Sequence, residues 1–414
     1  MLYWFAIWRE FKLSIAEIIS VFPGVSVLYS AKNIMIIDWI SETEILSKAP
    51  SLWWTIKIFE LKVLVDKESI LNSISNIWSS FNSKFNYWLN IYWEEKIRLA
   101  QFLMDVKRHL KSNNIWSRFV NKNDVNLSSA QILWNSLLKR WADINIVDLG
   151  WIFYFWKTIW VQDIDAYSAR DYWKSRDMDI WMLPPKLSQM MINLSRCESN
   201  EINSLYDPFI WLWTILIEWA YMWINNLFWS DFNPDMVQAS KSNLWNIKWK
   251  INNPLVSKSE IKNPLAPLSG GILEFSISII EADARDSEEN KILLNNKIDS
   301  IVTEWFLWEV MTQKNINLDR IWVQRKNLSK LYEKFFSWLT SIWFKWNIVI
   351  SFPFWDLKGK YVFFEEIYDI INSHCEILPL FPSEFDFKET KSWSLLYRRQ
   401  KQLVWREVFK LKIK

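Results

Sequence analysis

Two spacings of apolar residues alternate along the first 95 residues of the chain. Residues 2–8 and 33–40 are short, mainly apolar segments, which predict strands. In residues 14–22, Ile15, Ile18 and Ile19 recur at helical spacing, which predicts a helix. Strands and helices mixed in this way indicate an α/β or α+β module.

The next part of the chain predicts two helices and two strands. Residues 95–113 predict an amphipathic helix, because their apolar residues fall on one face. A second helix is predicted at 128–141, where Ser128 or Ser129 can serve as N-cap. Two strands joined at Gly150 are predicted to follow.

Beyond residue 200 strands and helices alternate regularly, which is typical of a parallel, doubly wound sheet. Strands are predicted at 204–209, 226–232, 271–283, 298–304 and 347–354, and helices at 214–222, 234–244 and 328–343.

Three local features complete the pattern. A helix is predicted after Pro184 and Pro185. The helix at 234–244 would have Asn233 as N-cap and Pro234 as its first residue. Residues 393–413 predict a hairpin of two strands.

Cysteine, histidine and net charge exclude several classes. The chain has two cysteines and two histidines, too few for a disulfide framework or a zinc site. We therefore expect a reducing cytoplasm and no metal. The net charge of +3 indicates no large basic tail for nucleic acid.

No targeting or membrane segment is expected. The amino terminus has no basic segment before its apolar residues, which argues against a signal peptide. Residues 209–229 have the length of a membrane helix but contain Glu218, Asn225 and Asn226. We expect a soluble, cytoplasmic protein without a membrane partner.

Basic residues gather on one short part of the chain. Between Leu99 and Lys122 there are five basic residues and one acidic residue, Asp105. Such a span is typical of phosphate contacts with RNA, although a solvated helix face has the same composition. The predicted RNA-binding residues are Lys107, Arg108, Lys111, Arg118 and Lys122.

Tryptophan and glycine have unusual frequencies. The chain contains 32 tryptophans and 5 glycines, whereas an ordinary chain of this length has roughly 29 glycines. Many tryptophans stand where the chain must bend, which is the conformational niche of glycine. One hypothesis is that UGA codons for glycine have been translated as tryptophan. The alternative is a protein that uses tryptophan at membrane interfaces or for stacking on bases.

The first strand of the doubly wound part leads into a candidate cofactor loop. It ends at Asp207, and with glycine at 211 and 213 the following residues become D-P-F-I-G-L-G-T. Glycines there let the backbone approach a ligand, whereas an indole would fill that space. With both indoles present, we expect a partly blocked cavity or a displaced loop on an intact sheet.

The next two strands also end in acidic residues. Asp231 can accept hydrogen bonds from ribose hydroxyls, and Asp283 from an adenine amino group. No lysine-threonine phosphate loop is present, which favours S-adenosylmethionine (SAM) over ATP. The alternative is an ordinary sheet with acidic loop starts. The predicted cofactor-binding residues are Asp207, Pro208, Phe209, Trp211, Trp213, Thr214, Asp231, Phe232, Asp283 and Ala284.

Several segments carry a resemblance to one family. They are "FAIWREFKLSIAEI", "SRFVNKNDVNLSSAQIL", "RDMDIWMLPPKLSQMMINL", the cofactor loops and the closing "LLYRRQKQLVWREVF". Over nearly its whole length the chain resembles the methyltransferases that modify the exocyclic N2 of guanosine in tRNA and carry a THUMP RNA-binding domain. The pair "MLPPKLSQMMINL" and D-P-F-x-G-x-G-T is the most specific part.

The resemblance implies an α/β fold. An amino-terminal α+β, THUMP-containing region would precede a Rossmann-like class I methyltransferase domain with a seven-stranded, mostly parallel sheet. It implies SAM as cofactor and tRNA as partner, and is compatible with a small partner subunit. The expected domains are a ferredoxin-like module at 1–95, a THUMP-like region at 96–168 and the methyltransferase domain at 169–414.

The fourth-strand loop departs from the family pattern. Glu304, Trp305, Phe306 and Leu307 stand where amino-group methyltransferases generally carry D-P-P-Y or N-P-P-Y. The resemblance gives Glu304 the role of accepting a hydrogen bond from guanosine N2, and Phe306 the role of stacking on the base. The alternative is that Glu304 is only a polar strand end.

Other functions remain open at this point. A DNA adenine-N6 methyltransferase uses the same cofactor loops, and a degenerate homologue would hold RNA without reacting. A tryptophan-rich surface protein, acting at membranes or polysaccharides, is a further alternative.

Overall fold

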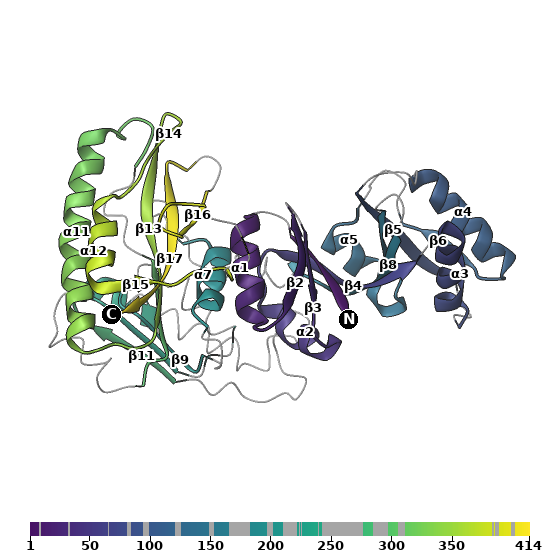
Figure 1. Cartoon of the computed structure of the whole chain (residues 1–414), viewed down its shortest axis with the longest axis horizontal. Coiled ribbons are helices and arrows are strands. Elements are labelled where there is room, and N and C mark those ends of the chain that lie inside the picture. Colours follow the sequence, from purple (N-terminus) through teal and green to yellow (C-terminus); the bar gives the residue numbers. More distant parts are fainter. Residues whose placement is uncertain are drawn as a thin grey trace. The chain divides into compact units, whose positions relative to one another are not determined.

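The computed structural model describes most of the chain in two compact units (Figure 1). Unit 1 comprises Met1–Phe11, Gly24–Pro50 and Trp54–Lys174, and unit 2 comprises Lys12–Pro23, Ser51–Trp53 and Ser175–Lys414. The three-domain division at residues 95 and 168 stays a prediction. The described residues are 1–7, 10–31, 34–64, 66–80, 84–93, 99–120, 126–148, 153–164, 183–196, 202–209, 222, 224, 226–238, 240–241, 276–284, 297–304, 311–382, 385, 389–398 and 402–414.

Unit 1 is built on one mixed sheet of eight strands. Their order is β2-β3-β1-β4-β8-β7-β5-β6. All neighbours are antiparallel except β5, which runs parallel to both β7 and β6. The strands are β1 (Leu2–Ile7), β2 (Ser26–Ala31), β3 (Ile34–Asp38), β4 (Thr55–Leu64), β5 (Phe85–Trp93), β6 (Ser117–Phe119), β7 (Asp143–Asp148) and β8 (Phe153–Val161).

The helices of unit 1 include the amphipathic helix predicted from the sequence. It is α4 (Leu99–Ser112), and Phe102, Leu103, Val106 and Leu110 are buried on its apolar face. They pack in one core with residues of β5, β7 and α3 (Lys67–Trp78). The unit also contains α2 (Glu42–Lys48).

The second predicted helix of this region is shorter than expected. Ser128 is its N-cap, as predicted, and forms a capping box with Gln131. Helix α5 (Ser129–Trp134) ends before Ser136, which has a φ of 53°. A separate 3-10 turn, Leu138–Arg140, follows. The prediction of one helix over 128–141 was wrong because residues of helical spacing continue across a left-handed break.

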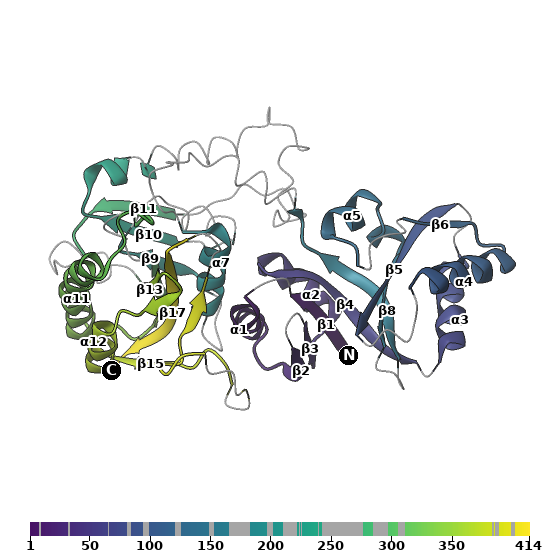
Figure 2. The same cartoon turned by 90° about the horizontal axis from the view of Figure 1, so that it is seen from above.

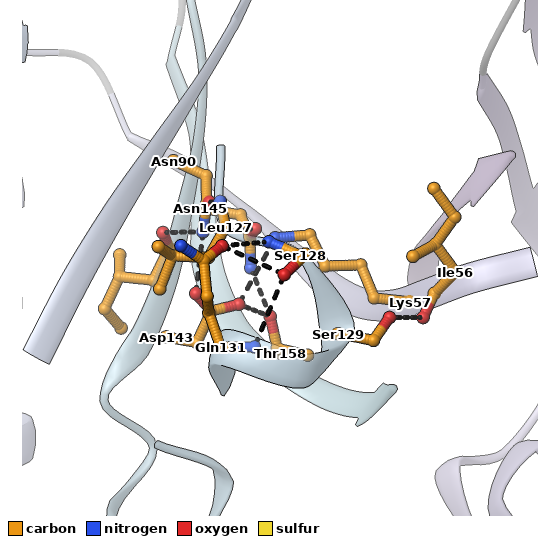
Figure 3. A network of polar contacts seen from close by, with 11 residues as sticks. Ile56, Lys57, Asn90, Leu127, Ser128, Ser129, Gln131, Asp143, Asn145 and Thr158 are labelled. Atoms are coloured by element: carbon orange, nitrogen blue, oxygen red, sulfur yellow. Dashed lines mark hydrogen bonds and ion pairs between the residues drawn. The ribbon is translucent and has the colours of Figure 1, made fainter. Parts of the chain in front are cut away.

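A buried polar network joins four strands of unit 1 (Figure 3). Lys57 Nζ lies 3.2 Å from Asp143 Oδ2, and Asn90 Nδ2 donates to Asp143 Oδ1 at 2.8 Å. Thr158 donates to the same carboxylate, and Leu127 N donates to Asn90 Oδ1 at 3.0 Å. The network therefore ties the segment that precedes α5 to the middle of the sheet.

The sheet of unit 2 has the order expected of a doubly wound domain. Along its main path the order is β11-β10-β9-β12-β13-β17-β15, with β14 on β13 and β16 on β17. The first five strands of this path are parallel, and β17 is antiparallel to β13 and β15. The strands are β9 (Ser204–Asp207), β10 (Asn226–Asp231), β11 (Ser276–Glu281), β12 (Ser300–Glu304), β13 (Asn347–Leu357), β14 (Lys360–Val362), β15 (Cys375–Ile377), β16 (Leu395–Tyr397) and β17 (Val404–Ile413).

This topology confirms the predicted Rossmann-like domain. The sheet has nine strands and not the predicted seven, because β14 and β16 pair outside the seven-stranded main path. Helices α11 (Leu318–Ser341) and α12 (Glu366–His374) lie on one face, and α7 (Pro185–Leu194) on the other (Figure 2). The closing hairpin is confirmed as β16 and β17. Helix α1 (Phe11–Val21) begins three residues before the predicted start at Ser14. Its Glu17 accepts a hydrogen bond from Asn193 of α7.

Helix α11 begins ten residues before the predicted start. Asn317 is its N-cap and accepts from the Arg320 amide at 2.9 Å. Exposed apolar side chains, Trp322 and Val323, stand in this first part. They obscure the apolar periodicity, which is why the sequence pattern predicted a start at 328.

Four of the tryptophans that the structure describes adopt the left-handed conformation that favours glycine. Their φ angles are between 51° and 69°. Trp343 follows α11 in a Schellman motif, in which Trp343 N donates to Thr340 O and Phe344 N donates to Leu339 O, both at 3.1 Å. Glycine is the residue most often found at that position. The four are Trp39, Trp141, Trp343 and Trp393.

Replacing Trp343 by glycine is expected to raise the free energy of unfolding by about 1 kcal/mol, because a left-handed residue with a Cβ costs about 1–2 kcal/mol. Trp343 is 74% exposed, so little packing is lost. The control is Trp322→Gly, at a 56% exposed position inside α11, which should lower stability by about 1 kcal/mol. Urea denaturation measures both variants, and effects of the same sign would contradict the explanation.

Candidate functional site

The strand order of unit 2 reverses at β9. This strand pairs with β10 on one side and β12 on the other, while the chain passes through β10 and β11 before β12. Ligands of such sheets bind outside the carboxyl ends of the strands at this reversal. The last residues of the three strands are all acidic: Asp207, Asp231 and Glu304.

Asp207 is a buried carboxylate fixed by two donors. Thr303 Oγ1 donates to Asp207 Oδ1 at 2.6 Å, and the Phe209 amide donates to the same oxygen at 3.1 Å. Burial raises the pKa of Asp207 well above its ordinary value, and the charges of Asp231 and Glu304 raise it further against the effect of these hydrogen bonds. Asp207 thus lies close enough to Asp231 and to Glu304 for their negative charges to act on it.

Asp231 is the last residue of β10, and its side chain accepts a hydrogen bond from the loop that follows. Its Oδ1 accepts from the Asn233 amide, and Asn233 Oδ1 accepts from the Asp235 amide, both at 2.9 Å. The second bond confirms Asn233 as the N-cap of the helix that starts at Pro234. The Asp231 carbonyl accepts from the Ala282 amide at 2.9 Å, which joins this loop to the end of β11.

The remaining described cofactor candidates differ in exposure. Phe232 is exposed, and Asp283 is half-buried just after β11. Pro208, Phe209 and Ala284 are buried. Phe209 packs against Phe335 of α11, with ring centroids 5.6 Å apart. These residues line up at one end of the sheet, but their part in cofactor binding stays a prediction.

Glu304 is paired with a residue that the sequence analysis did not select. Arg406 Nε donates to Glu304 Oε1, and Arg406 is only 2% exposed. Burial raises the pKa of Glu304, while the positive charge of Arg406 opposes the rise. Arg406 and Glu407 are adjacent charged residues inside the largely apolar strand β17, and this feature of the sequence could have singled them out.

Glu407 lies in a different environment from Arg406. It accepts hydrogen bonds from Ser394 and from Tyr368 of α12. Burial raises the pKa of Glu407 to about 7. Adjacent strand residues face opposite sides of a sheet. Glu407 therefore faces the side that carries α12, whereas Arg406 faces the other side and pairs with Glu304.

Four described residues of the predicted RNA-binding set are exposed. Lys107, Arg108 and Lys111 lie on α4, and Arg118 lies on β6. The single acid of this span, Asp105, is already engaged by Lys67 and by Arg108 Nη2 at 3.3 Å. Trp116 is an exposed aromatic side chain in the same span, between α4 and β6.

Five predicted site residues lie outside the described residues. They are Trp211, Trp213, Thr214, Phe306 and Lys122. The expected obstruction of the cavity by two indoles lies there as well.

The described residues lack two features. None of their helices combines the length and the apolar character that crossing a membrane requires. No group of three or more histidine, cysteine, aspartate or glutamate side chains among them is arranged to hold a metal ion.

Comparison with known proteins gave structural likenesses alone, since no family model and no curated protein matches the sequence. TrmN from Thermus thermophilus is 12% identical, with 100% of both chains covered and a TM-score of 0.46. A structure described as a possible methylase from Clostridium difficile 630 is 11% identical, covering 100% of this chain and 98% of that chain with a TM-score of 0.42. SMU.472 complexed with SAH is 9% identical, covering 99% and 97% with a TM-score of 0.38.

Proposed function

We propose that the chain is a SAM-dependent RNA methyltransferase that acts on the exocyclic N2 of a guanosine in tRNA. The observation that carries the proposal is the meeting of Asp207, Asp231 and Glu304 at the carboxyl ends of three strands where strand order reverses. The residue types and the motifs shared with the tRNA methyltransferases support the same function.

The charge of this site favours SAM over a nucleoside polyphosphate. Acidic side chains at the ends of neighbouring strands favour a ligand with a net positive charge, which SAM has, over a ligand with several phosphate groups. Asp231 would hold the ribose hydroxyls and Asp283 the adenine amino group. The bound cofactor would supply a methyl group on a sulfonium.

The side chains at the end of β12 would serve the acceptor base. An exocyclic guanine amine is a weak nucleophile, so positioning must provide much of the rate. Glu304 would accept a hydrogen bond from N2 and stabilise the positive charge that develops there. Phe306 would stack on a base turned out of its helix, as in other base-modifying enzymes.

Methyl transfer to tRNA tests the proposal. The full chain is incubated with radiolabelled SAM and either unmodified tRNA or duplex DNA, and the nucleosides are then separated. We expect N2-methylguanosine. Label in duplex DNA would favour an adenine methyltransferase, and RNA binding without incorporation would favour a degenerate homologue.

Replacing Lys107 and Lys111 together by alanine is expected to weaken tRNA binding. Their ammonium groups would contact phosphates, so the slope of log K against log salt should become shallower by about 1.5–2. The matched control is Lys330→Ala with Lys334→Ala, two exposed lysines at the same spacing on α11. A filter-binding titration over several salt concentrations measures both. An equal change of slope in the two variants would exclude α4 as the RNA site.

A further inference from the structure

Arg406 is a buried cation with unused hydrogen-bonding capacity. Its Nε donates to Glu304, but Nη1 and Nη2 have no hydrogen-bond partner within the described part of the chain. Buried polar groups in proteins are nearly always hydrogen-bonded, and leaving charged donors unpaired costs free energy. The two Nη groups therefore indicate a ligand that accepts hydrogen bonds from them.

The strand register places Arg406 beside the carboxyl end of β12. Glu304, the last residue of β12, pairs with Ser351 of β13. Strand β13 continues beyond this point, and Arg406 of β17 pairs with Pro353, two residues farther along. Arg406 thus stands just past the end of β12, on the side of the sheet edge where Asp207 and Asp231 also end their strands.

A carboxylate next to a guanidinium presents acceptors beside donors. The Watson–Crick edge of guanine has the complementary order, with N2–H and N1–H as donors followed by the O6 acceptor. Adenine presents its amino group beside the N1 lone pair. If its amino group bound Glu304, the N1 lone pair would also face the carboxylate and be repelled. Arginine is also the side chain most often used to bind guanine O6.

Building on the proposed function, we propose that Arg406 is the specificity-determining residue that selects guanine, by donating from its Nη groups to O6 while Glu304 accepts from N1–H and N2–H. The pair recognises the base before transfer. Arg406 also holds the Glu304 carboxylate through Nε, which orients its free oxygen toward the base.

Transfer to tRNA containing 2-aminopurine at the target position tests this role. This base keeps the N2 amino group but lacks O6 and the N1 proton. With the unaltered chain, we expect kcat/KM for 2-aminopurine to be lower by about 100-fold or more, since two contacts are lost. Arg406→Ala should slow guanosine by about 10- to 100-fold and 2-aminopurine by less than about threefold, because the lost contact is absent from that substrate. Arg406→Lys should restore part of the guanosine rate.

The control is Arg398→Ala, which breaks the exposed pair of Arg398 with Glu389 in the same unit. It should leave both substrates unchanged. Equal slowing of the two substrates by Arg406→Ala would show a merely structural role and overturn the inference. Should the variant not fold, equal rates of the unaltered chain on the two RNAs would overturn it too. Transfer to neither RNA would reject the proposed function, and this inference with it.

Discussion

Replacing Asp143 by alanine is expected to lower the free energy of unfolding by about 3–5 kcal/mol, because it leaves the Lys57 charge buried without its partner. Lys57 is 3% exposed, and Asp143 also accepts from Asn90 and Thr158 (Figure 3). A loss of this size is a large part of the roughly 5–15 kcal/mol that stabilises a domain. Unit 1 should therefore be largely unfolded at moderate urea concentrations.

The pH dependence of this variant provides a second readout. Burial by itself lowers the pKa of Lys57, but the Asp143 carboxylate and Tyr92 together outweigh burial, so that the pKa is raised. In the unaltered chain the pair therefore stabilises the fold below the ordinary lysine pKa, and this contribution is lost as pH rises through the raised value. In Asp143→Ala the buried lysine has a lowered pKa, the unfolded chain binds more protons, and stability should instead rise with pH up to about 10.

Removing both charges is the control for Asp143→Ala. The double variant Lys57→Met with Asp143→Leu fills the same space with apolar atoms, and its stability should change by less than about 2 kcal/mol. Circular dichroism in urea at pH 7 and pH 9 measures the three chains. If Asp143→Ala lowered the free energy of unfolding no more than the double variant at both pH values, the unpaired Lys57 charge would not be buried away from water.

Replacing Trp211 and Trp213 together by glycine is expected to raise the affinity for SAM by about 100-fold or more, which corresponds to about 2.7 kcal/mol. These residues follow Asp207 and Phe209 in the sequence, where the motif predicts a turn that brings the backbone against the ligand. An indole would fill that space, and glycine leaves it open. Trp39→Gly with Trp343→Gly is the control, because both are exposed tryptophans in the left-handed conformation. An equal gain in the control would show that loss of tryptophan in general, and not the loop, causes the effect.

Local structure was largely predictable from the sequence, because periodicity records which face of an element is buried. The apolar face of α4, the capping of α5 by Ser128 and the strands ending at Asp207, Asp231 and Glu304 all follow from short segments. The break at Ser136 was not predictable in this way, since its left-handed conformation interrupts a pattern that continues on both sides.

The charged pairs could not be predicted, because they depend on strand order. Lys57 and Asp143 are 86 residues apart, and Glu304 and Arg406 are 102 residues apart. Each pair meets only after the sheet has placed distant strands near each other, and no spacing in the sequence records this. The roles of Trp211, Trp213 and Phe306 stay predictions from the motif, since these residues lie outside the described part of the chain.

Calorimetric titration with SAM tests most directly whether the carboxyl ends of β9, β10 and β12 form the cofactor site. In the chain with glycine at 211 and 213, we predict saturable binding of one SAM per chain. Adding Asp231→Ala should weaken it by about 10- to 100-fold, the loss of charged hydrogen bonds to the ribose. Absence of saturable binding, or an affinity unchanged by Asp231→Ala, would contradict the assignment of this site.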